Sequence, residues 1–134
     1  MTSSSLEHVN VTVADPKRTA QLLSDVFGWY VRWQGESIHQ GYSMHVGNDR
    51  DYIAIYSQAT LQGQADNSYV TGGGLNHIGV HVDDLAATEQ RLVAAGIKTF
   101  SHQTYEPGSR FYFRDYDGIE YEVLSYTTTD QKTH

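Results

Sequence analysis

Gly74-Leu75-Asn76-His77-Ile78-Gly79-Val80-His81-Val82-Asp83-Asp84 is the stretch that decides the fold, because the chain contains a close copy of it. The copy is Leu6–Asp15, which also alternates apolar with polar residues and also carries a His near its start. Alternation with period two predicts half-buried β-strands that turn one apolar face to a core. We therefore expect two related strands, each with a polar face that bears a His.

The similarity continues beyond the two strands. Asp15-Pro16 predicts a helix that ends at Gly28, since Asp favours the N-cap, Pro the first turn and Gly the C-terminal end. Asp84 and Gly96 bound a second predicted helix, and Leu85, Leu92 and Val93 are expected to help form its buried stripe. Three strand-like runs follow each helix: Trp29–Trp33, Tyr42–Val46 and Tyr52–Tyr56 in the first half, and Lys98–His102, Arg110–Arg114 and Ile119–Tyr126 in the second.

The spacing between the two halves is nearly constant. His8 and His77 are 69 positions apart, and Gly28 and Gly96 are 68 apart. Self-similarity at a fixed offset indicates a duplicated unit. The sequence therefore predicts an α+β fold of two tandem βαβββ modules in a single domain, 1–134. Module 1 spans about 6–58, a polar connector about 59–73, and module 2 about 74–126.

Composition argues against several classes of function. The net charge is −7 with only nine Lys and Arg, whereas nucleic-acid binding needs clustered basic residues. The absence of Cys excludes disulfides and thiolate metal ligands. No apolar run approaches the roughly 20 residues of a membrane span. We therefore expect a soluble, cytoplasmic protein that binds neither nucleic acid nor membrane.

The polar faces of three predicted strands supply a candidate metal site. At an offset of 68, Glu122 corresponds to Ala54, so that His8, His77 and Glu122 all stand at matched places in the two modules. A single His on a strand is more often structural, and a single Glu is usually a solvated carboxylate. Together, two imidazoles and one carboxylate suit Fe(II), Mn(II) or Zn(II) and leave coordination positions open for a small molecule.

Arg114–Glu122, together with the paired βαβββ units and their strand-borne His residues, resembles the vicinal oxygen chelate superfamily. This superfamily includes glyoxalase I, extradiol dioxygenases, fosfomycin-resistance thiol transferases and metal-free bleomycin resistance proteins. The resemblance covers residues 6–126 and implies glyoxalase-like cupped sheets around a metal. It further implies that His8, His77 and Glu122 are the ligands, and that a homodimer shares its sites between chains.

The resemblance leaves the reaction open. Ala54 stands where glyoxalase I has a fourth, acidic ligand, so ring-cleaving dioxygenase-like or lyase chemistry on a small oxygen-chelating substrate is favoured. Extradiol dioxygenases carry a signature that runs from a His through an acid-Pro turn to the ligand Glu. This chain matches the signature in part, with Tyr116 in place of the Pro. The alternatives are a metal-free binding protein of the bleomycin resistance type and a fosfomycin-type thiol transferase. His102 and Glu106 stand in for the phosphonate-binding Lys and Ser of the latter, and an acid there would repel a phosphonate.

Polar residues near the expected ligands are candidates for catalysis and for substrate binding. Tyr112 or His102 is the leading candidate for proton transfer, and His81 is the fallback. Arg110 and Asn10 are expected to contact the substrate, and Glu120 is expected to be a surface residue or an outer contact of the site. These residues identify neither the substrate nor the metal, and they leave open whether a site lies within one chain or across a dimer.

Overall fold

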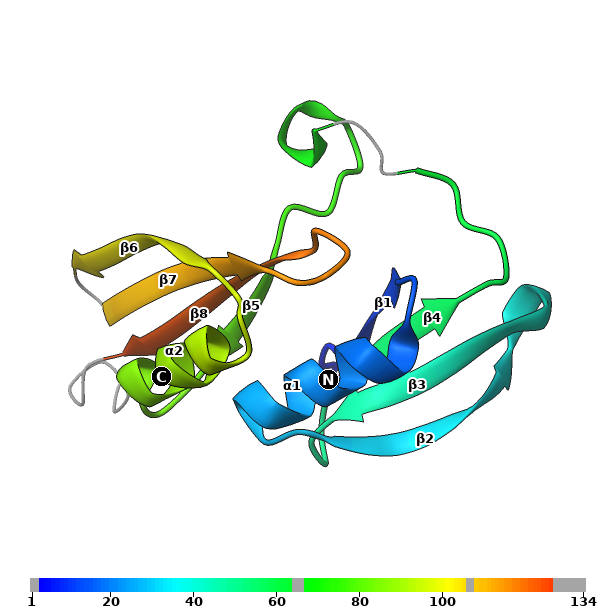
Figure 1. Ribbon diagram of the computed structural model, residues 1–134, viewed down its shortest axis with the longest axis horizontal. Coiled ribbons are helices and arrows are strands. Elements are labelled where there is room, and N and C mark those ends of the chain that lie inside the picture. The colour runs from blue at the N-terminus through cyan, green and yellow to red at the C-terminus, as the bar shows by residue number, and fades with distance from the viewer. Residues whose placement is uncertain (1–2, 64–66, 106–107, 127–134) are drawn as a thin grey trace. The chain divides into compact units, whose positions relative to one another are not determined.

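The computed structural model describes residues 3–63, 67–105 and 108–126, and the chain forms two compact units, Met1–Gln62 and Gly63–His134. Each unit is a four-stranded sheet with one α-helix (Figure 1). Unit 1 contains β1 (His8–Thr12), α1 (Pro16–Phe27), β2 (Tyr30–Ser37), the short 3-10 helix η1 (Ile38–Gln40), β3 (Gly41–Gly47) and β4 (Tyr52–Ser57). Unit 2 contains the 3-10 helix η2 (Ser68–Val70), β5 (Ile78–His81), α2 (Leu85–Ala94), β6 (Thr99–Tyr105), β7 (Gly108–Arg114) and β8 (Glu120–Tyr126).

The two sheets have the same topology, which confirms the predicted α+β fold and its repeat. Their strand orders are β1-β4-β3-β2 and β5-β8-β7-β6, and in each sheet the first pair is parallel and the others are antiparallel. The register places Asn10 beside Ala54 in unit 1 and Gly79 beside Glu122 in unit 2. Ala54 and Glu122 therefore occupy corresponding positions, as the constant offset predicts.

The helix ends follow the predicted capping residues. The Asp15 carboxylate accepts a hydrogen bond from the backbone N–H of Arg18 at 3.2 Å, and Asp84 accepts from that of Ala87 at 3.0 Å. Gly28 has a φ of 73°, a left-handed conformation that favours glycine at the end of a helix. These caps fix where α1 and α2 begin and where α1 ends, and so set the directions in which the chain enters and leaves each helix.

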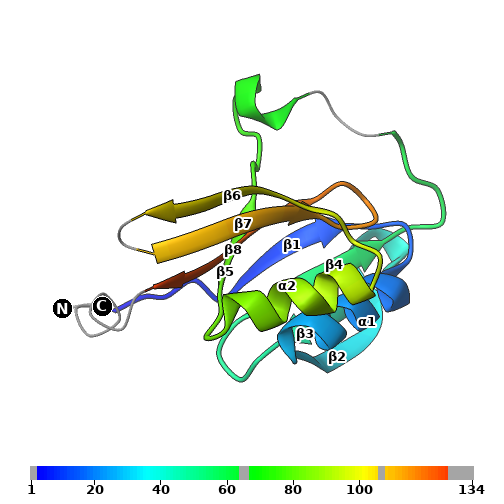
Figure 2. The ribbon, with the colours of Figure 1, turned by 60° about the vertical axis from the view of Figure 1, so that its left-hand side comes forward.

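The apolar face of α2 is narrower than the sequence predicts. Leu92 is fully buried and Thr88 lies one turn before it on the same face. Val93, expected in the buried stripe, is 62% exposed because it lies about 100° further round the helix. The prediction was wrong for Val93. Figure 2 shows α2 lying along one face of the sheet of unit 2.

The core of unit 2 lies on the face of the sheet that packs against α2. Phe111, Phe113, Tyr121 and Val123 alternate along β7 and β8 and are fully buried there. The rings of Phe113 and Tyr121 stack at 4.7 Å. Because side chains alternate along a strand, the residues between these four point to the opposite face. That opposite face carries the candidate site.

A buried acid builds the turn that leads into β8. The Asp115 carboxylate accepts hydrogen bonds from the backbone N–H groups of Asp117 and Ile119, both at 3.0 Å. Burial raises the pKa of Asp115, and these hydrogen bonds oppose that rise. Gly118 completes the turn with a φ of 80°. The turn fixes the register in which Glu120 and Glu122 enter the sheet.

Strand boundaries differ from the predicted ones in two places that affect the site. β5 begins at Ile78, so His77 lies just before the strand. The pairing of β6 with β7 shifts between Phe100 and Gln103, where Ser101 has a φ of 56°. This irregularity is a β-bulge, which changes the face to which the following side chain points. None of the helices within the described part of the chain is long and apolar enough to span a membrane.

Candidate functional site

The centre of the candidate site is the approach of His77 to Glu122. His77 Nε2 and Glu122 Oε1 are 3.4 Å apart. The His77 side chain is 34% exposed and that of Glu122 is 12% exposed, so the pair is open to solvent mainly on the His side. Both residues were predicted as metal ligands, and the structure of unit 2 brings them together.

Arg110 holds the second oxygen of the same carboxylate. Its Nη1 lies 3.0 Å from Glu122 Oε2, and its side chain is only 17% exposed. A hydrogen bond between two ionised groups is short and directional. Arg110 was expected to contact substrate, and its contact in the structure is with Glu122. It therefore orients the carboxylate with Oε1 towards His77.

A second acid and a Tyr lie on the other side of the His77 ring. Glu120 accepts hydrogen bonds from the Tyr69 hydroxyl and, at 3.1 Å, from Arg114 Nη2. The Tyr69 oxygen is 3.3 Å from His77 Nδ1, and Glu120 Oε2 is 3.8 Å from the same nitrogen. The hydrogen bond to Glu120 is the largest cause that raises the pKa of Tyr69 to about 12. The two ring nitrogens of His77 thus face different carboxylates.

Tyr112 also belongs to this cluster. It pairs with Glu122 across β7 and β8, and its ring meets the His77 ring edge-on at a centroid distance of 5.7 Å. A phenol at this place can donate or accept a proton beside the His77–Glu122 pair. The sequence-based choice of Tyr112 for proton transfer is compatible with this placement.

Unit 1 presents one of the predicted ligands on its own sheet. His8 stacks on Tyr52 at 4.9 Å, and its Nδ1 lies 2.8 Å from Glu7 Oε1. The pKa of Glu7 is lowered, mainly by its hydrogen bond with His8. With Nδ1 engaged, Nε2 is the nitrogen of His8 that remains for a ligand. Asn10, expected to bind substrate, is exposed two residues further along β1.

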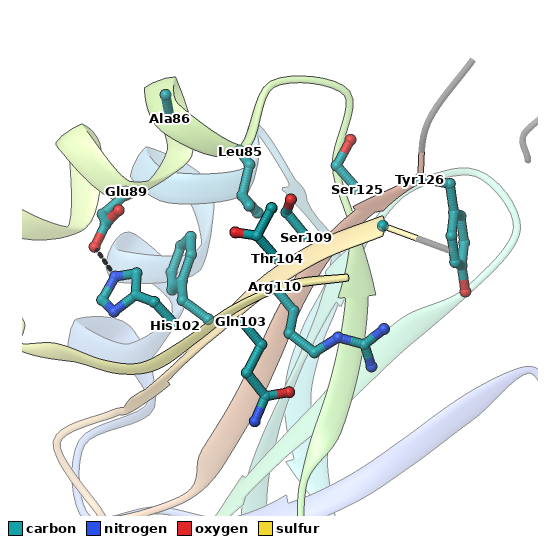
Figure 3. A pocket seen from close by; sticks show the side chains of 12 residues that line it. Leu85, Ala86, Glu89, His102, Gln103, Thr104, Ser109, Arg110, Ser125 and Tyr126 are labelled. Carbon is teal, nitrogen blue, oxygen red and sulfur yellow. Dashed lines mark hydrogen bonds and ion pairs between the residues drawn. The ribbon is translucent and has the colours of Figure 1, made fainter. Parts of the chain in front are cut away.

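The structure does not bring His102 to the Glu122 face. His102 follows the bulge in β6, and its Nε2 lies 2.6 Å from Glu89 Oε2 on α2. Its ring stacks on Phe111, which belongs to the buried face. Figure 3 shows His102 turned towards Glu89. Both residues line a pocket of about 430 Å³. Glu106, the other residue compared with the fosfomycin enzymes, lies outside the described residues.

His81 is exposed and lies on β5, an edge strand of the sheet of unit 2. It pairs with Leu124, and its ring stacks on Tyr126 at 5.5 Å. This position is one pleat beyond Gly79, the strand partner of Glu122. Of the three candidates for proton transfer, Tyr112 is therefore the one with a ring contact to His77 in the structure.

The donor set of unit 2 fits part of a metal site. Within residues 3–63, 67–105 and 108–126, no three His, Asp or Glu side chains are gathered to hold an ion. His77 and Glu122 are a converging nitrogen and oxygen, the donor types that divalent transition metals take. Glu122 also has the hydrogen-bonded outer partner that ligating carboxylates usually have, Arg110. The third predicted ligand, His8, belongs to unit 1.

Sequence reasoning missed Tyr69 and treated Glu120 as a surface residue or an outer contact of the site. The signal for Glu120 was its place two residues before Glu122 on an otherwise apolar strand. Tyr69 carries a weaker signal, since an aromatic residue in a polar connector has no periodic pattern around it. The structure adds both residues to the site through their contacts with His77.

Comparison with solved structures shows the same fold in several bacterial proteins. The glyoxylase/bleomycin resistance protein/dioxygenase domain from Frankia sp. EAN1pec has a TM-score of 0.81 and 21% identity, covering 99% of this chain and 100% of that one. The glyoxalase family protein from Enterococcus faecalis has a TM-score of 0.73 and 16% identity, covering 90% and 96%. The fosfomycin resistance protein FosX from Listeria monocytogenes, solved with Mn(II) and sulfate, has a TM-score of 0.70 and 18% identity, covering 98% and 99%.

Comparison at the level of sequence defines the family. A search of curated proteins found no match. The family profile described as Glyoxalase/Bleomycin resistance protein/Dioxygenase superfamily matches residues 5–123, which is most of the 134-residue chain. The chain therefore belongs to the glyoxalase/bleomycin resistance protein/dioxygenase superfamily.

Proposed function

We propose that this protein is a metal-dependent enzyme with His8, His77 and Glu122 as the ligands of one divalent ion. The observation that carries the proposal is the 3.4 Å approach of His77 Nε2 to Glu122 Oε1. A converging imidazole nitrogen and carboxylate oxygen are two of the donor types that a divalent transition metal takes.

The substrate that suits this site is a small molecule with two adjacent oxygens. A bound ion would act on those oxygens as a Lewis acid. Arg110 keeps Glu122 oriented and offsets part of its charge, so it acts on the substrate through that carboxylate. Tyr112 exchanges a proton with the substrate beside His77, and Asn10 offers an amide from the polar face of β1.

The proposed chemistry is ring-cleaving oxygenation of the dioxygenase type or a lyase reaction. Ala54 lacks the fourth acidic ligand of glyoxalase I, which argues against that activity. Mn(II) is the first ion to test, because FosX from Listeria monocytogenes was solved with Mn(II) on the same fold. We further propose a homodimer in which each site takes His8 from one chain and His77 with Glu122 from the other.

Metal content is the test of this proposal. Protein purified after growth with Fe, Mn and Zn should carry about one divalent ion per chain, as one three-ligand site implies. Removal of the ion by a chelator should lower the thermal stability. Adding the ion back to a free concentration of about 100 times its dissociation constant should raise the free energy of unfolding by about 2.7 kcal/mol. Metal-free protein that shows no thermal shift with any of the three ions would contradict the proposal.

A metal-free binding protein is the second candidate, and the Arg110–Glu122 ion pair favours it. This pair is largely buried and neutralises the carboxylate without any metal. The net charge of −7 attracts cationic ligands. A flat aromatic cation that binds equally well after chelator treatment and in the Glu122→Gln variant would favour the binding protein.

A fosfomycin-type activity uses a different substrate and can be separated from the other candidates by turnover. Fosfomycin, a thiol and Mn(II) are supplied together, and loss of the antibiotic is followed. Catechols under oxygen form the parallel assay for dioxygenase-like chemistry. The proposed enzyme should turn over a substrate in an assay that a chelator abolishes and one particular metal restores.

A further inference from the structure

We propose that Tyr69, in the connector before β5, is a positioning residue for His77. A relay of hydrogen bonds from His77 to Tyr69 to Glu120 keeps a proton on Nδ1 and leaves Nε2 free to face Glu122. The consequence for metal binding rests on the proposed function. The relay itself is a property of the metal-free chain and can be tested without any ion.

The direction of the relay follows from what each group can donate. An ionised carboxylate only accepts hydrogen bonds, so the Tyr69 hydroxyl donates its proton to Glu120 Oε2. The same phenol oxygen, 3.3 Å from His77 Nδ1, is then an acceptor for an N–H on that nitrogen.

Glu120 is held in place to receive this hydrogen bond. Its other oxygen accepts a hydrogen bond from Arg114 Nη2 at 3.1 Å, and its side chain is only 11% exposed. Direct contact of Glu120 with His77 is looser, at 3.8 Å from Nδ1. The Tyr69 hydroxyl is therefore the nearer partner of His77 Nδ1, and it links the ring to the Glu120 carboxylate.

Hydrogen bonds within the connector hold Tyr69 in the position from which its hydroxyl reaches His77. The Asn67 side-chain oxygen accepts from the Tyr69 backbone N–H at 2.9 Å, and the Thr71 hydroxyl donates to the Asn67 carbonyl at 2.7 Å. The Gly74 N–H donates to the Thr71 carbonyl at 2.9 Å. A Cβ added to Gly74 would lie 2.4 Å from the Ser68 carbonyl oxygen. Only glycine at position 74 allows the turn to close this tightly.

The relay matters because the other ring nitrogen of a ligating His usually donates to an acceptor that fixes the tautomer and the ring orientation. In unit 1 the acceptor for His8 Nδ1 is Glu7 itself, at 2.8 Å. In unit 2 the acid reaches the ring through Tyr69. Loss of such an outer partner typically costs about 10- to 100-fold in metal affinity.

The test is the tautomer of His77 in the metal-free protein, read from nitrogen-15 NMR and assigned with a His77→Gln variant. Spectra are taken at about pH 8, above the ordinary His pKa of about 6.5. The wild type should show the proton on Nδ1. Tyr69→Phe, which keeps the ring and removes the hydroxyl, should lose this preference. Its affinity for Mn(II) should fall about 10- to 100-fold.

A second variant and a control separate the relay from general damage to the connector. Gly74→Ala should displace Tyr69 without altering any side chain of the site, and should weaken the tautomer preference in the same way. Val70→Ala alters a neighbouring side chain that is 83% exposed and should change neither measurement. Circular dichroism of each variant checks that the fold is kept.

The outcomes distinguish the relay from the proposed function. A wild type with the proton on Nε2, or a tautomer preference that Tyr69→Phe leaves unchanged, overturns the relay. A tautomer that changes while the Mn(II) affinity stays the same overturns its role in metal binding. If the tautomer responds as expected but no variant and no wild-type protein binds a metal, the relay stands and the proposed function fails.

Discussion

Refolding His8→Ala chains together with Glu122→Ala chains should restore metal binding that neither variant has alone. In the proposed dimer, His8 of one chain completes a site with His77 and Glu122 of its partner. Each mixed dimer then has one intact site and one doubly broken site. Random pairing makes half of the dimers mixed, so about one quarter of all sites should bind an ion tightly.

A matched mixture provides the control for this complementation. His77→Ala and Glu122→Ala both alter unit 2, so no mixed dimer of these two variants contains an intact site. This mixture should remain without tight binding. Mass spectrometry under native conditions shows whether mixed dimers form. Mixed dimers of His8→Ala with Glu122→Ala that bind no metal would contradict the shared site.

Phe113→Ala should lower the free energy of unfolding by about 3–5 kcal/mol, the usual cost of removing a fully buried Phe. Phe113 is completely buried and stacks on Tyr121, the residue between Glu120 and Glu122 on β8. The cavity left behind should loosen the strand that carries both acids. The change is measured by urea unfolding, monitored by far-UV circular dichroism.

Val93→Ala is the control for this loss of stability. Val93 lies in the same unit but is 62% exposed, and surface substitutions usually change stability by no more than about 0.5 kcal/mol. A Phe113→Ala protein that is as stable as Val93→Ala would show that the stacked pair is not the core of unit 2.

The repeat could be predicted from the sequence because it depends on local patterns that occur twice. Period-two alternation marks the strands that lead to His8 and His77, and Asp with Gly marks the helix ends. The constant offset then aligned Glu122 with Ala54 without any knowledge of the sheet. These are signals that short segments carry independently of tertiary contacts.

The face to which His102 points could not be predicted in this way. Strict alternation puts His102 on the same face as Phe100, two residues before it. The bulge at Ser101 shifts the pairing with β7 and turns His102 to Glu89 on α2. A bulge of this kind depends on the pairing of two strands, and no local pattern in the sequence marked it.

Tyr69 and Arg110 required the register of the sheet. Tyr69 meets Glu120, which is 51 residues away along the chain. Arg110 reaches Glu122 across two strands whose alignment is set by the turn at Asp115. Such contacts follow from tertiary structure alone. The sequence could supply the ligand candidates, whereas the partners that orient them came from the fold.

Calorimetric titration of Mn(II) into the wild type, His77→Ala and His81→Ala tests the central claim most directly. His81 is the matched control, because it lies four residues later at the edge of the same sheet and contacts Tyr126 instead of Glu122. We predict about one ion per wild-type chain and the same affinity for His81→Ala. His77→Ala should bind Mn(II) at least about 100-fold more weakly. Loss of a residue that only orients a ligand typically lowers metal affinity by about 10- to 100-fold, and loss of a ligand should cost at least as much. A His77→Ala protein that binds Mn(II) as tightly as the wild type, or a wild type that binds none, would contradict the account.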